Sequence, residues 1–291
     1  VSRLRSPVSI IEKAAKRLDE LRRSGVDLPT RQPPTGPAGG EPATPERLLR
    51  TIERGERRAA VLPEPDAPAA KEGVPSEPAR QSKRVQIDLA RLAAAGYVTP
   101  DAQRSQLADE FRVIKRPLLD NVQGRSAAPV QRANLIMVSS SVPGEGKTFV
   151  AINLAMSLAM ELNNTVLLVD ADVARPSILE RLGLPPSKGL LDVLTNPQLA
   201  FHDVLLRTNV DKLALLPAGT AQGHATELLA SDAMRRLIDE LATRYADRIV
   251  VFDAPPLLPS TESRVLATHM GQIVLVVEAE RTPQGSVTQA L

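Results

Sequence analysis

Three groups of residues in this chain have the types and spacing that can hold phosphates and a divalent cation. The first lies in the run 135–148, where an apolar stretch ends in small residues up to Ser141 and Val-Pro-Gly-Glu-Gly leads into Lys147 and Thr148. A strand, a glycine-containing loop and a helix N-terminus offer backbone N–H groups and a helix dipole to phosphates. Lys147 adds a positive charge for the phosphate oxygens, and the Thr148 hydroxyl suits magnesium. The strict motif has glycine where Ser141 stands.

The second group is Asp170 and Asp172, which close a further apolar run and are followed by Arg175. In an extended chain this spacing puts both carboxylates on the same side. Two like charges at a strand end favour a neutralising cation, so the pair indicates magnesium or a basic partner. The alternative interpretation is that these side chains cap the helix that follows.

The third group centres on Asp253, which closes the hydrophobic run 248–252 and precedes Ala-Pro-Pro. This pattern is typical of a Walker B strand, whose carboxylate holds magnesium. Many strands end in aspartate, so the motif is weak on its own. The three groups together predict a site for ATP and Mg²⁺.

The elements that position these groups alternate along the chain. Apolar runs predict strands at 135–140, 166–171, 213–216, 248–253 and 272–278. Helical patterns fall at 147–162, 177–182, 189–194, 226–244, 260–269 and from 283 onward. Upstream, 85–95 is helical or partly extended, and 103–120 has the helical spacing of Leu107, Phe111, Ile114 and Leu118. The alternation predicts an α/β, P-loop NTPase fold with a doubly wound, mostly parallel sheet, in which ligands bind at the carboxyl ends of the strands.

The composition limits the classes of protein that the chain can represent. Of its 291 residues 43% are apolar but only 2% aromatic, so aliphatic side chains must fill the core, as in α/β sheets. The net charge of +2 does not indicate non-specific nucleic-acid binding, and we expect no nucleic-acid partner. The lack of cysteine excludes disulfides, thiolate metal sites, cysteine nucleophiles and P-loop scaffold ATPases that carry iron–sulfur clusters. The sequence shows neither a secretory signal nor an apolar run of ~18 residues, which predicts a cytoplasmic protein.

Three regions are predicted along the chain. Residues 1–24 form an amphipathic helix that could dock on another protein, lie on a membrane surface or fold back onto the main domain. Residues 25–82 are rich in Pro, Gly, Ala, Glu and Arg, which predicts a disordered linker. Residues 83–291 form the P-loop domain. Because the sequence starts at Val1 and stops at Leu291 within a helical pattern, we expect a C-terminally truncated fragment.

The combined motifs resemble those of the bacterial tyrosine kinases, P-loop enzymes unrelated to eukaryotic protein kinases. The matching segments are Pro143–Lys147, Asp170–Asp172, Asp253–Pro256, Gly189–Leu190, Pro217–Gly219 and Glu227–Ser231. The resemblance covers roughly residues 84–291. The nearer similarity is to the exosortase-associated tyrosine autokinases of exopolysaccharide loci, through the Ile-Ile-Glu-Lys-Ala helix, the Pro-rich linker and the segment 109–119.

This resemblance implies an ATP-dependent tyrosine autokinase that regulates exopolysaccharide synthesis or export. It assigns nucleotide binding to Ser141, Pro143, Gly144, Glu145, Gly146, Lys147, Thr148 and Phe149. It assigns magnesium to Thr148, Asp172 and Asp253, and catalysis to Lys147, Asp170, Asp172 and Arg175. Asp170 is the candidate that orients or deprotonates the tyrosine hydroxyl. A carboxylate of pKa ~4 is a poor base for a phenol of pKa ~10, so positioning and charge carry most of the work. Arg175 either stabilises the transferring phosphate or pairs with Asp172.

Two departures from the family pattern concern partners and the second motif. The oligomerisation motif Glu-x-x-Arg-x-x-Arg is represented by Asp109, Arg112 and Lys115, and lysine lacks the bidentate fork of arginine. We still expect a homo-oligomer through these residues. Ala174 stands where the family often has arginine, and Arg175 follows it. The resemblance also implies recruitment to the inner face of the plasma membrane by a separate membrane polysaccharide chain-length regulator.

The C-terminal tyrosine cluster of these kinases is absent, and only Tyr97 and Tyr245 occur. We expect Tyr245, just before a buried strand, to be a packing residue. Tyr97, beside a break, is expected to be a more exposed loop tyrosine. We expect that truncation, and not lost activity, accounts for the missing cluster. The histidines have no ligand spacing and are expected to be ordinary; they are His202, His224 and His269.

Two other functions compete with kinase activity. Partition and cell-division ATPases of the related deviant P-loop class place lysine at the second residue of the loop, where this chain has Val142. That position argues against such an ATPase. An ATP-binding, non-catalytic scaffold of a polysaccharide machine is the second competitor, because phosphate and magnesium ligands alone do not establish transfer.

Overall fold

The computed structural model describes residues 82–101, 105–245 and 247–291. All of them belong to one compact unit that spans residues 73–291. The helix predicted over 1–24 and, apart from Ser82, the linker predicted over 25–82 lie outside the described residues. Within the described part of the chain, no helix is long and apolar enough to cross a membrane.

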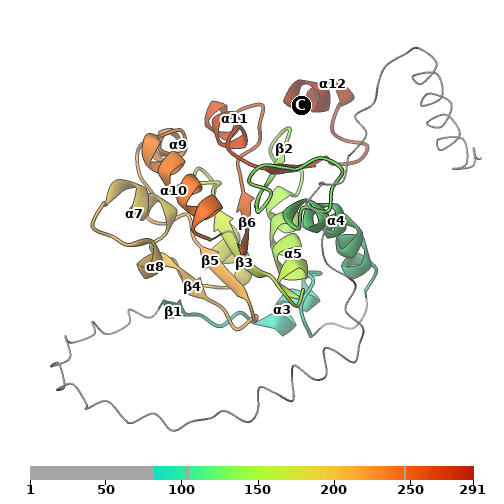
Figure 1. The fold of residues 1–291 in the computed structure, drawn as a ribbon, viewed down its shortest axis with the longest axis horizontal. Helices are drawn as coiled ribbons and strands as arrows, with labels where there is room; N and C mark the ends of the chain where they lie inside the picture. Colours follow the sequence, from blue (N-terminus) through green and yellow to red (C-terminus); the bar gives the residue numbers. More distant parts are fainter. Residues whose placement is uncertain (1–81, 102–104, 246) are drawn as a thin grey trace, which may run out of the picture. The chain divides into compact units, whose positions relative to one another are not determined.

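The described residues form one seven-stranded sheet, shown in Figure 1. From edge to edge the strands are β1 (Lys83–Arg84), β4 (Leu206–Arg207), β5 (Leu213–Leu216), β3 (Thr165–Asp170), β6 (Arg248–Asp253), β2 (Leu135–Ser140) and β7 (Gln272–Val276). Every neighbouring pair is parallel except β4 and β5, which are antiparallel. The predicted doubly wound, mostly parallel sheet is confirmed.

Helices cover both faces of this sheet (Figure 1). One face carries α3 (Leu89–Ala94), α4 (Gln106–Val122), α5 (Lys147–Ala159) and α6 (Ile178–Leu182). The other carries α7 (Leu190–Thr195), α8 (Phe201–Val204), α9 (Ala225–Leu229), α10 (Asp232–Thr243) and α11 (Thr261–Ala267). The last helix, α12 (Gln284–Ala290), has no fully buried residue. Successive strand side chains point to opposite faces, so Ile136 and Val138 join the first hydrophobic cluster, and Leu135 and Met137 the second.

The sequence sets the boundaries of several helices through their caps. Ser105, Ser231 and Ser260 each accept a hydrogen bond from the backbone N–H three residues on, and each such cap stabilises its helix by about 1 kcal/mol. Ser231 also explains the one predicted helix that is divided. The segment 226–244 forms α9 and α10, because Ser231 ends the first and caps the second.

The structure buries one residue of the predicted oligomer contact inside the chain. Lys115 does not face outward from α4: its ammonium donates to the Ser157 carbonyl at 2.7 Å and pairs with Glu161 at 2.7 Å. Lys115 is 7% exposed, whereas Ile114 of the predicted apolar stripe is 39% exposed. Asp109 and Arg112 form an exposed ion pair on the same helix. A lysine can bury its aliphatic stem where its ammonium group finds polar partners. The spacing of apolar residues therefore did not predict that Lys115 is buried.

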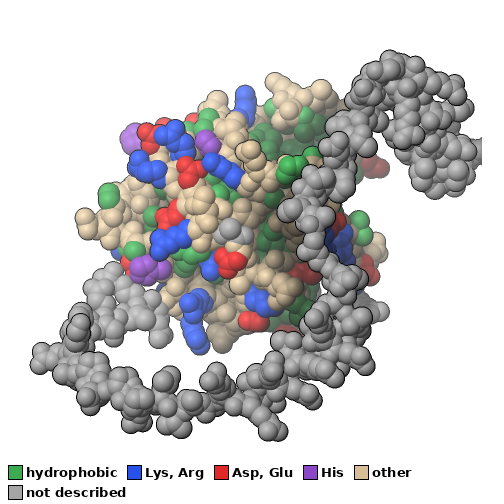
Figure 2. Space-filling model, viewed as in Figure 1, with side chains coloured by type: hydrophobic (Ala, Val, Ile, Leu, Met, Phe, Trp, Pro, Cys, Tyr) green, Lys and Arg blue, Asp and Glu red, His purple; other side chains and the backbone are tan. Residues whose placement is uncertain are grey.

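Side chains of both charge signs are interspersed on the face of the molecule shown in Figure 2. On α10, for example, Asp232 pairs with Arg235 at 2.9 Å and Glu240 with Arg244 at 2.8 Å. Exposed pairs of this kind stabilise a fold by only about 0.2–1 kcal/mol. Their mixture means that the described part of this face carries no broad patch of one sign.

Candidate functional site

The three sequence motifs meet at one cleft at the carboxyl ends of the strands. The loop between β2 and α5, the segment after β3 and the segment after β6 surround a cavity of about 500 Å³, here called the P-loop cleft. Its lining consists of Pro143, Gly144, Gly146, Lys147, Thr148, Asp172, Ala174, Arg175, Ser177, Arg181, Thr226, Pro255, Pro256, Pro259, Ser260 and Glu262. Ligands bind doubly wound sheets at this edge, so the fold itself explains why distant motifs converge.

The loop that leads into α5 has the backbone shape of a phosphate cradle. Gly144 and Gly146 have φ values of 92° and 88°, a region that side chains other than glycine rarely adopt. Gly146 is the N-cap of α5, and no side chain accepts hydrogen bonds from the first turn. The N–H groups of that turn are therefore available to an anion, which the helix dipole also attracts.

Lys147 and Asp172 form the central ion pair of the cleft. The ammonium Nζ lies 2.5 Å from Asp172 Oδ2, and the two side chains are 13% and 5% exposed. Two sequence motifs that stand 25 residues apart thus meet directly. The carboxylate holds the ammonium at the cleft wall, where a phosphate could replace it as partner.

Asp253 is a buried carboxylate without a partner. It is fully buried, and neither carboxylate oxygen has a hydrogen-bond partner among the described residues. Burial is the largest influence on its pKa and raises it to about 6, although the nearby Lys147 charge and the Thr148 hydroxyl act in the opposite direction. An unpaired buried carboxylate is costly unless a cation or a proton neutralises it. Asp253 therefore has the properties of a cation ligand.

Asp170 serves a different purpose from the one predicted. Its Oδ2 accepts hydrogen bonds from the backbone N–H groups of Ser177 and Ile178, at 3.2 and 3.1 Å, where α6 begins. Burial and then the Asp253 charge raise the pKa of this carboxyl to about 7. Asp170 does not line the P-loop cleft, so this geometry does not support direct contact with a substrate hydroxyl. The alternative interpretation, a helix cap, applies to Asp170.

The oxygen ligands around the cleft fit magnesium. Thr148 and Asp172 line the cleft, and the unpartnered oxygens of Asp253 lie at the end of the adjacent strand. No cluster of three or more acidic, histidine or cysteine side chains able to hold a metal occurs among the described residues. Magnesium at phosphate sites takes few protein oxygens and fills its shell with water and phosphate, so such a cluster is not required.

Three of the predicted nucleotide-binding residues do not present their side chains to the cleft. Ser141 is fully buried, and Phe149 packs its ring against Tyr97 at 5.0 Å between centroids. Glu145 turns toward the segment after β7, where its carboxylate accepts hydrogen bonds from Val142 N at 2.7 Å and from the Thr282 hydroxyl. Burial raises the pKa of Glu145, but these hydrogen bonds outweigh it and leave the pKa below its usual value. Glu145 thus braces the loop from outside.

Sequence reasoning missed several cleft residues. Several residues from α6, α9, α11 and the positions just before α6 and α11 line the cleft; they are Ser177, Arg181, Thr226, Ser260 and Glu262. Ser177 Oγ lies 3.4 Å from the Thr148 hydroxyl. None of these residues belongs to a recognisable motif. The one signal that could have suggested them is their position in the sequence, within a few residues of a strand end or a helix start near the cleft.

The two tyrosines, Tyr97 and Tyr245, both pack against other aromatic rings. Tyr245 packs against Phe201, with ring centroids 6.1 Å apart, which confirms the predicted packing role. Tyr97 is 9% exposed, so its predicted exposure is wrong. Its hydroxyl lies 3.2 Å from Arg181 Nη1, and its ring fills the space beside the first turn of α5.

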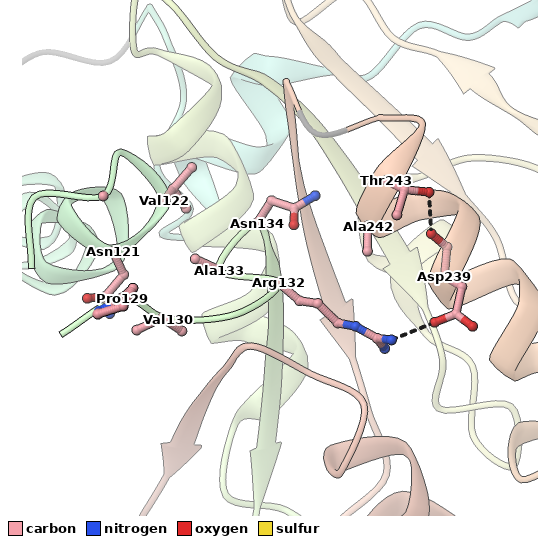
Figure 3. A pocket seen from close by; sticks show the side chains of 11 residues that line it. Asn121, Val122, Pro129, Val130, Arg132, Ala133, Asn134, Asp239, Ala242 and Thr243 are labelled. Atoms are coloured by element: carbon pink, nitrogen blue, oxygen red, sulfur yellow. Dashed lines mark hydrogen bonds and ion pairs between the residues drawn. The ribbon is translucent and has the colours of Figure 1, made fainter.

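A second cavity, of about 560 Å³, lies at the opposite, amino-terminal edge of the strands (Figure 3). Arg132 crosses toward α10 and pairs with Asp239 at 2.7 Å. Asn134 donates to the Arg248 carbonyl at 3.3 Å, which ties the start of β2 to β6. No predicted site residue lines this cavity.

Comparisons with known proteins agree with this geometry. Residues 133–289, more than half of the chain, match the family described as AAA domain. The chain belongs to the AAA domain family. This chain is similar to the succinoglycan biosynthesis transport protein ExoP of Rhizobium meliloti (strain 1021), at 34% identity over 197 residues that cover 67% of this chain and 24% of ExoP. It is also similar to the tyrosine-protein kinase YwqD of Bacillus subtilis (strain 168), at 31% identity over 53% of this chain and 64% of YwqD.

The AAA domain also resembles solved kinase domains. The crystal structure of the VpsO kinase domain matches with a TM-score of 0.54 and 30% identity, over 63% of this chain and 85% of that domain. The resemblance to bacterial tyrosine kinases of exopolysaccharide loci and the P-loop NTPase fold are thereby confirmed. Membership of the exosortase-associated subgroup stays a prediction. The chain spans about a quarter or less of the length of several curated relatives, ExoP among them.

Proposed function

We propose that this chain is an ATP-dependent protein tyrosine kinase domain, which transfers the γ-phosphoryl group of ATP to a tyrosine hydroxyl. The observation that carries the proposal is the convergence of Lys147, Asp172 and the glycine loop on one cleft, with Asp253 at the adjacent strand end. Relatives named as tyrosine-protein kinases support the choice of acceptor. The bond broken is that between the γ-phosphorus and its bridging oxygen, and the phenol loses its proton.

Each group of residues has a task in this transfer. The N–H groups of the glycine loop hold the phosphate chain, and Lys147 exchanges its partner Asp172 for phosphate oxygens. Thr148, Asp253 and Asp172 would hold magnesium, which neutralises phosphate charge when bound. Asp172 faces the cleft and is released from Lys147 by this exchange, so it is the carboxylate best placed to orient the incoming hydroxyl. Asp170 fixes the start of α6 and thereby the segment that carries Arg175.

Transfer to a tyrosine polymer tests this proposal directly. The chain is incubated with labelled Mg-ATP and a Glu–Tyr copolymer, and phosphotyrosine is measured for wild type, Lys147→Met and the control Lys188→Met, which alters an exposed lysine outside the cleft. Lys147→Met should lower transfer by about 100-fold or more, and Lys188→Met should not. ADP without phosphotyrosine would favour a partition-type ATPase, and tight ATP binding with neither product would favour the scaffold.

We further propose that the domain acts at the inner face of the plasma membrane, in oligomers recruited by a membrane protein that regulates polysaccharide chain length. The name of ExoP, a biosynthesis transport protein, supports the polysaccharide context. Asp109 and Arg112 are exposed on α4 beside Val113 and Ile114, which are 75% and 39% exposed. Arg112→Glu should shift the mass measured by light scattering toward the monomer; an unchanged mass would remove α4 from the interface.

A further inference from the structure

Arg181 is a cleft cation that no sequence motif assigned. It belongs to α6, and its side chain lines the P-loop cleft together with Lys147 and Arg175. Lys147 already has Asp172 as partner, whereas within the described residues Arg181 forms no ion pair with any carboxylate. A guanidinium that faces a cleft without an acidic partner is suited to an anionic ligand.

The orientation of Arg181 is set by a tyrosine from a distant part of the chain. Its one side-chain hydrogen bond among the described residues joins Nη1 to the Tyr97 hydroxyl at 3.2 Å, across 84 positions of sequence. The Tyr97 ring is held against Phe149, in the first turn of α5, so the hydroxyl has a fixed position beside the phosphate loop. One of the five N–H donors of the guanidinium is used in this way, and the other four have no partner among the residues that the structure describes.

The charge of Arg181 also reaches the part of the site where the cation ligands lie. Burial raises the pKa of Asp253, and Arg181 is among the positive charges that oppose this effect. The guanidinium is therefore close enough to act electrostatically on the region between Lys147 and Asp253. A phosphate chain bound in the glycine loop would occupy the same region.

We propose that Arg181 binds the polyphosphate chain of the nucleotide, and that the Tyr97 hydroxyl is a positioning group that holds the guanidinium for this contact. The proposal rests on the proposed function, because it requires that a nucleotide occupies the P-loop cleft. It adds to that function a residue outside all three motifs. A purely structural role of the Arg181–Tyr97 contact predicts instead a loss of stability without any change in nucleotide preference.

Calorimetric titration of the full chain with Mg-ATP and with AMP tests both parts. Arg181→Gln should weaken Mg-ATP binding by about 10-fold to 100-fold, the range for loss of a charged hydrogen bond, and AMP binding far less. Arg181→Lys keeps the charge but not the planar fork, and should lie between wild type and Arg181→Gln. Arg236→Gln, which removes an exposed arginine of α10 outside the cleft, is the matched control for net charge and should behave as wild type.

A double-mutant cycle tests the positioning role of Tyr97. Tyr97→Phe keeps the ring packing and should weaken Mg-ATP binding by about threefold to tenfold, with no further loss when added to Arg181→Gln. If wild type does not bind Mg-ATP, the proposed function fails. If wild type binds and both Arg181 variants match it, or weaken AMP binding equally, the phosphate contact is refuted. An equal effect of Tyr97→Phe in both backgrounds would refute the positioning role.

Discussion

Single residues at the carboxyl ends of the strands, in or beside the P-loop cleft, carry buried charges, and a bound cation or phosphate would reduce the free-energy cost of burying them. Lys147 is paired with Asp172, while Asp253 and one oxygen of Asp170 are buried without hydrogen-bond partners among the described residues. Burial is the largest cause that raises their carboxyl pKa values, to about 6 for Asp253 and about 7 for Asp170, and the charge of Asp253 raises the pKa of Asp170 further. The metal-free fold therefore carries a pH-dependent cost at this site.

Replacing Asp253 by asparagine should stabilise the metal-free protein at high pH. In the unfolded chain the carboxyl ionises near pH 4, but in the folded chain only near pH 6, so ionisation opposes folding in between. The cost is absent below about pH 4, grows through the interval and is complete above about pH 7. Asp253→Asn should thus gain roughly 2–3 kcal/mol of unfolding free energy at pH 8 relative to its effect at pH 4.

Urea unfolding in EDTA between these pH values measures this difference. Asp211→Asn, a change at an exposed aspartate, is the matched control. The comparison across pH cancels any pH-independent loss from the new amide. If Asp253→Asn changes the unfolding free energy equally at pH 4 and pH 8, the Asp253 carboxyl does not have a raised pKa in the folded protein, and the prediction is contradicted.

Between elements, Glu145 connects the phosphate loop to the segment after β7. Its carboxylate accepts hydrogen bonds from Val142 N and the Thr282 hydroxyl, and a longer one from Glu278 N at 3.4 Å. The loop and the approach to α12 are thus held by one side chain. We therefore expect a displacement of the segment after β7 to change the conformation of the phosphate loop, and the reverse.

Removing the Thr282 hydroxyl should loosen this connection. We expect Thr282→Val to lower the unfolding free energy by about 1 kcal/mol and to weaken Mg-ATP binding by a few-fold, because the loop is less well held before binding. Thr282→Ser retains the hydroxyl and should behave as wild type. Thermal unfolding and calorimetric titration provide the two readouts. A stability loss with unchanged affinity would show that the brace does not reach the nucleotide.

The contact between α4 and α5 leads to a second prediction, on how Lys115 contributes to stability. Lys115→Met removes the ammonium that joins the Ser157 carbonyl and Glu161, so the unfolding free energy should fall by about 1–3 kcal/mol. The oligomer mass should not change once the protein is folded. Urea unfolding and light scattering separate the two effects, with Arg112→Glu as the contrasting variant. A monomeric but equally stable Lys115→Met would reverse this assignment.

Elements with a long, regular hydrophobic pattern were predictable from the sequence. The boundaries of β2, β5 and β6 agree with the prediction, since each contains an uninterrupted run of four apolar residues. The strands β1 and β4 and the short helix α8 were not anticipated, because two residues show no period and the sequence Phe-His-Asp-Val of α8 has no apolar run. The predicted helix 226–244 is divided by a single serine cap, at Ser231. The helical spacing of the apolar residues gives no sign of this break.

Cleft residues were predictable only where a motif marks them. Lys147, Thr148 and Asp172 lie in the cleft as their motifs indicate. The turn of Glu145 toward Thr282 and the helix-capping role of Asp170 depend on contacts with segments that are distant or irregular, which spacing does not encode. The burial of Tyr97 likewise follows from Phe149, more than fifty residues later in the chain.

Across the whole molecule, the chemistry is confined to one edge of the sheet. The carboxyl ends of β2, β3 and β6 deliver the glycine loop, Asp172 and Asp253, while the opposite edge carries the cavity around Arg132. Among the described residues, Val113 and Ile114 of α4 are exposed away from this edge. If the proposed oligomer forms through α4, phosphate binding and assembly use separate parts of the chain.

The most direct test of the central claim is the ratio of phosphotyrosine formed to ADP released, measured in one reaction with Mg-ATP and the Glu–Tyr copolymer. A kinase couples the two products, so the ratio should approach one at saturating acceptor, and both products should disappear in Lys147→Met. A ratio near zero with sustained ADP release would contradict the account, because the cleft would then deliver the γ-phosphoryl group to water and not to tyrosine.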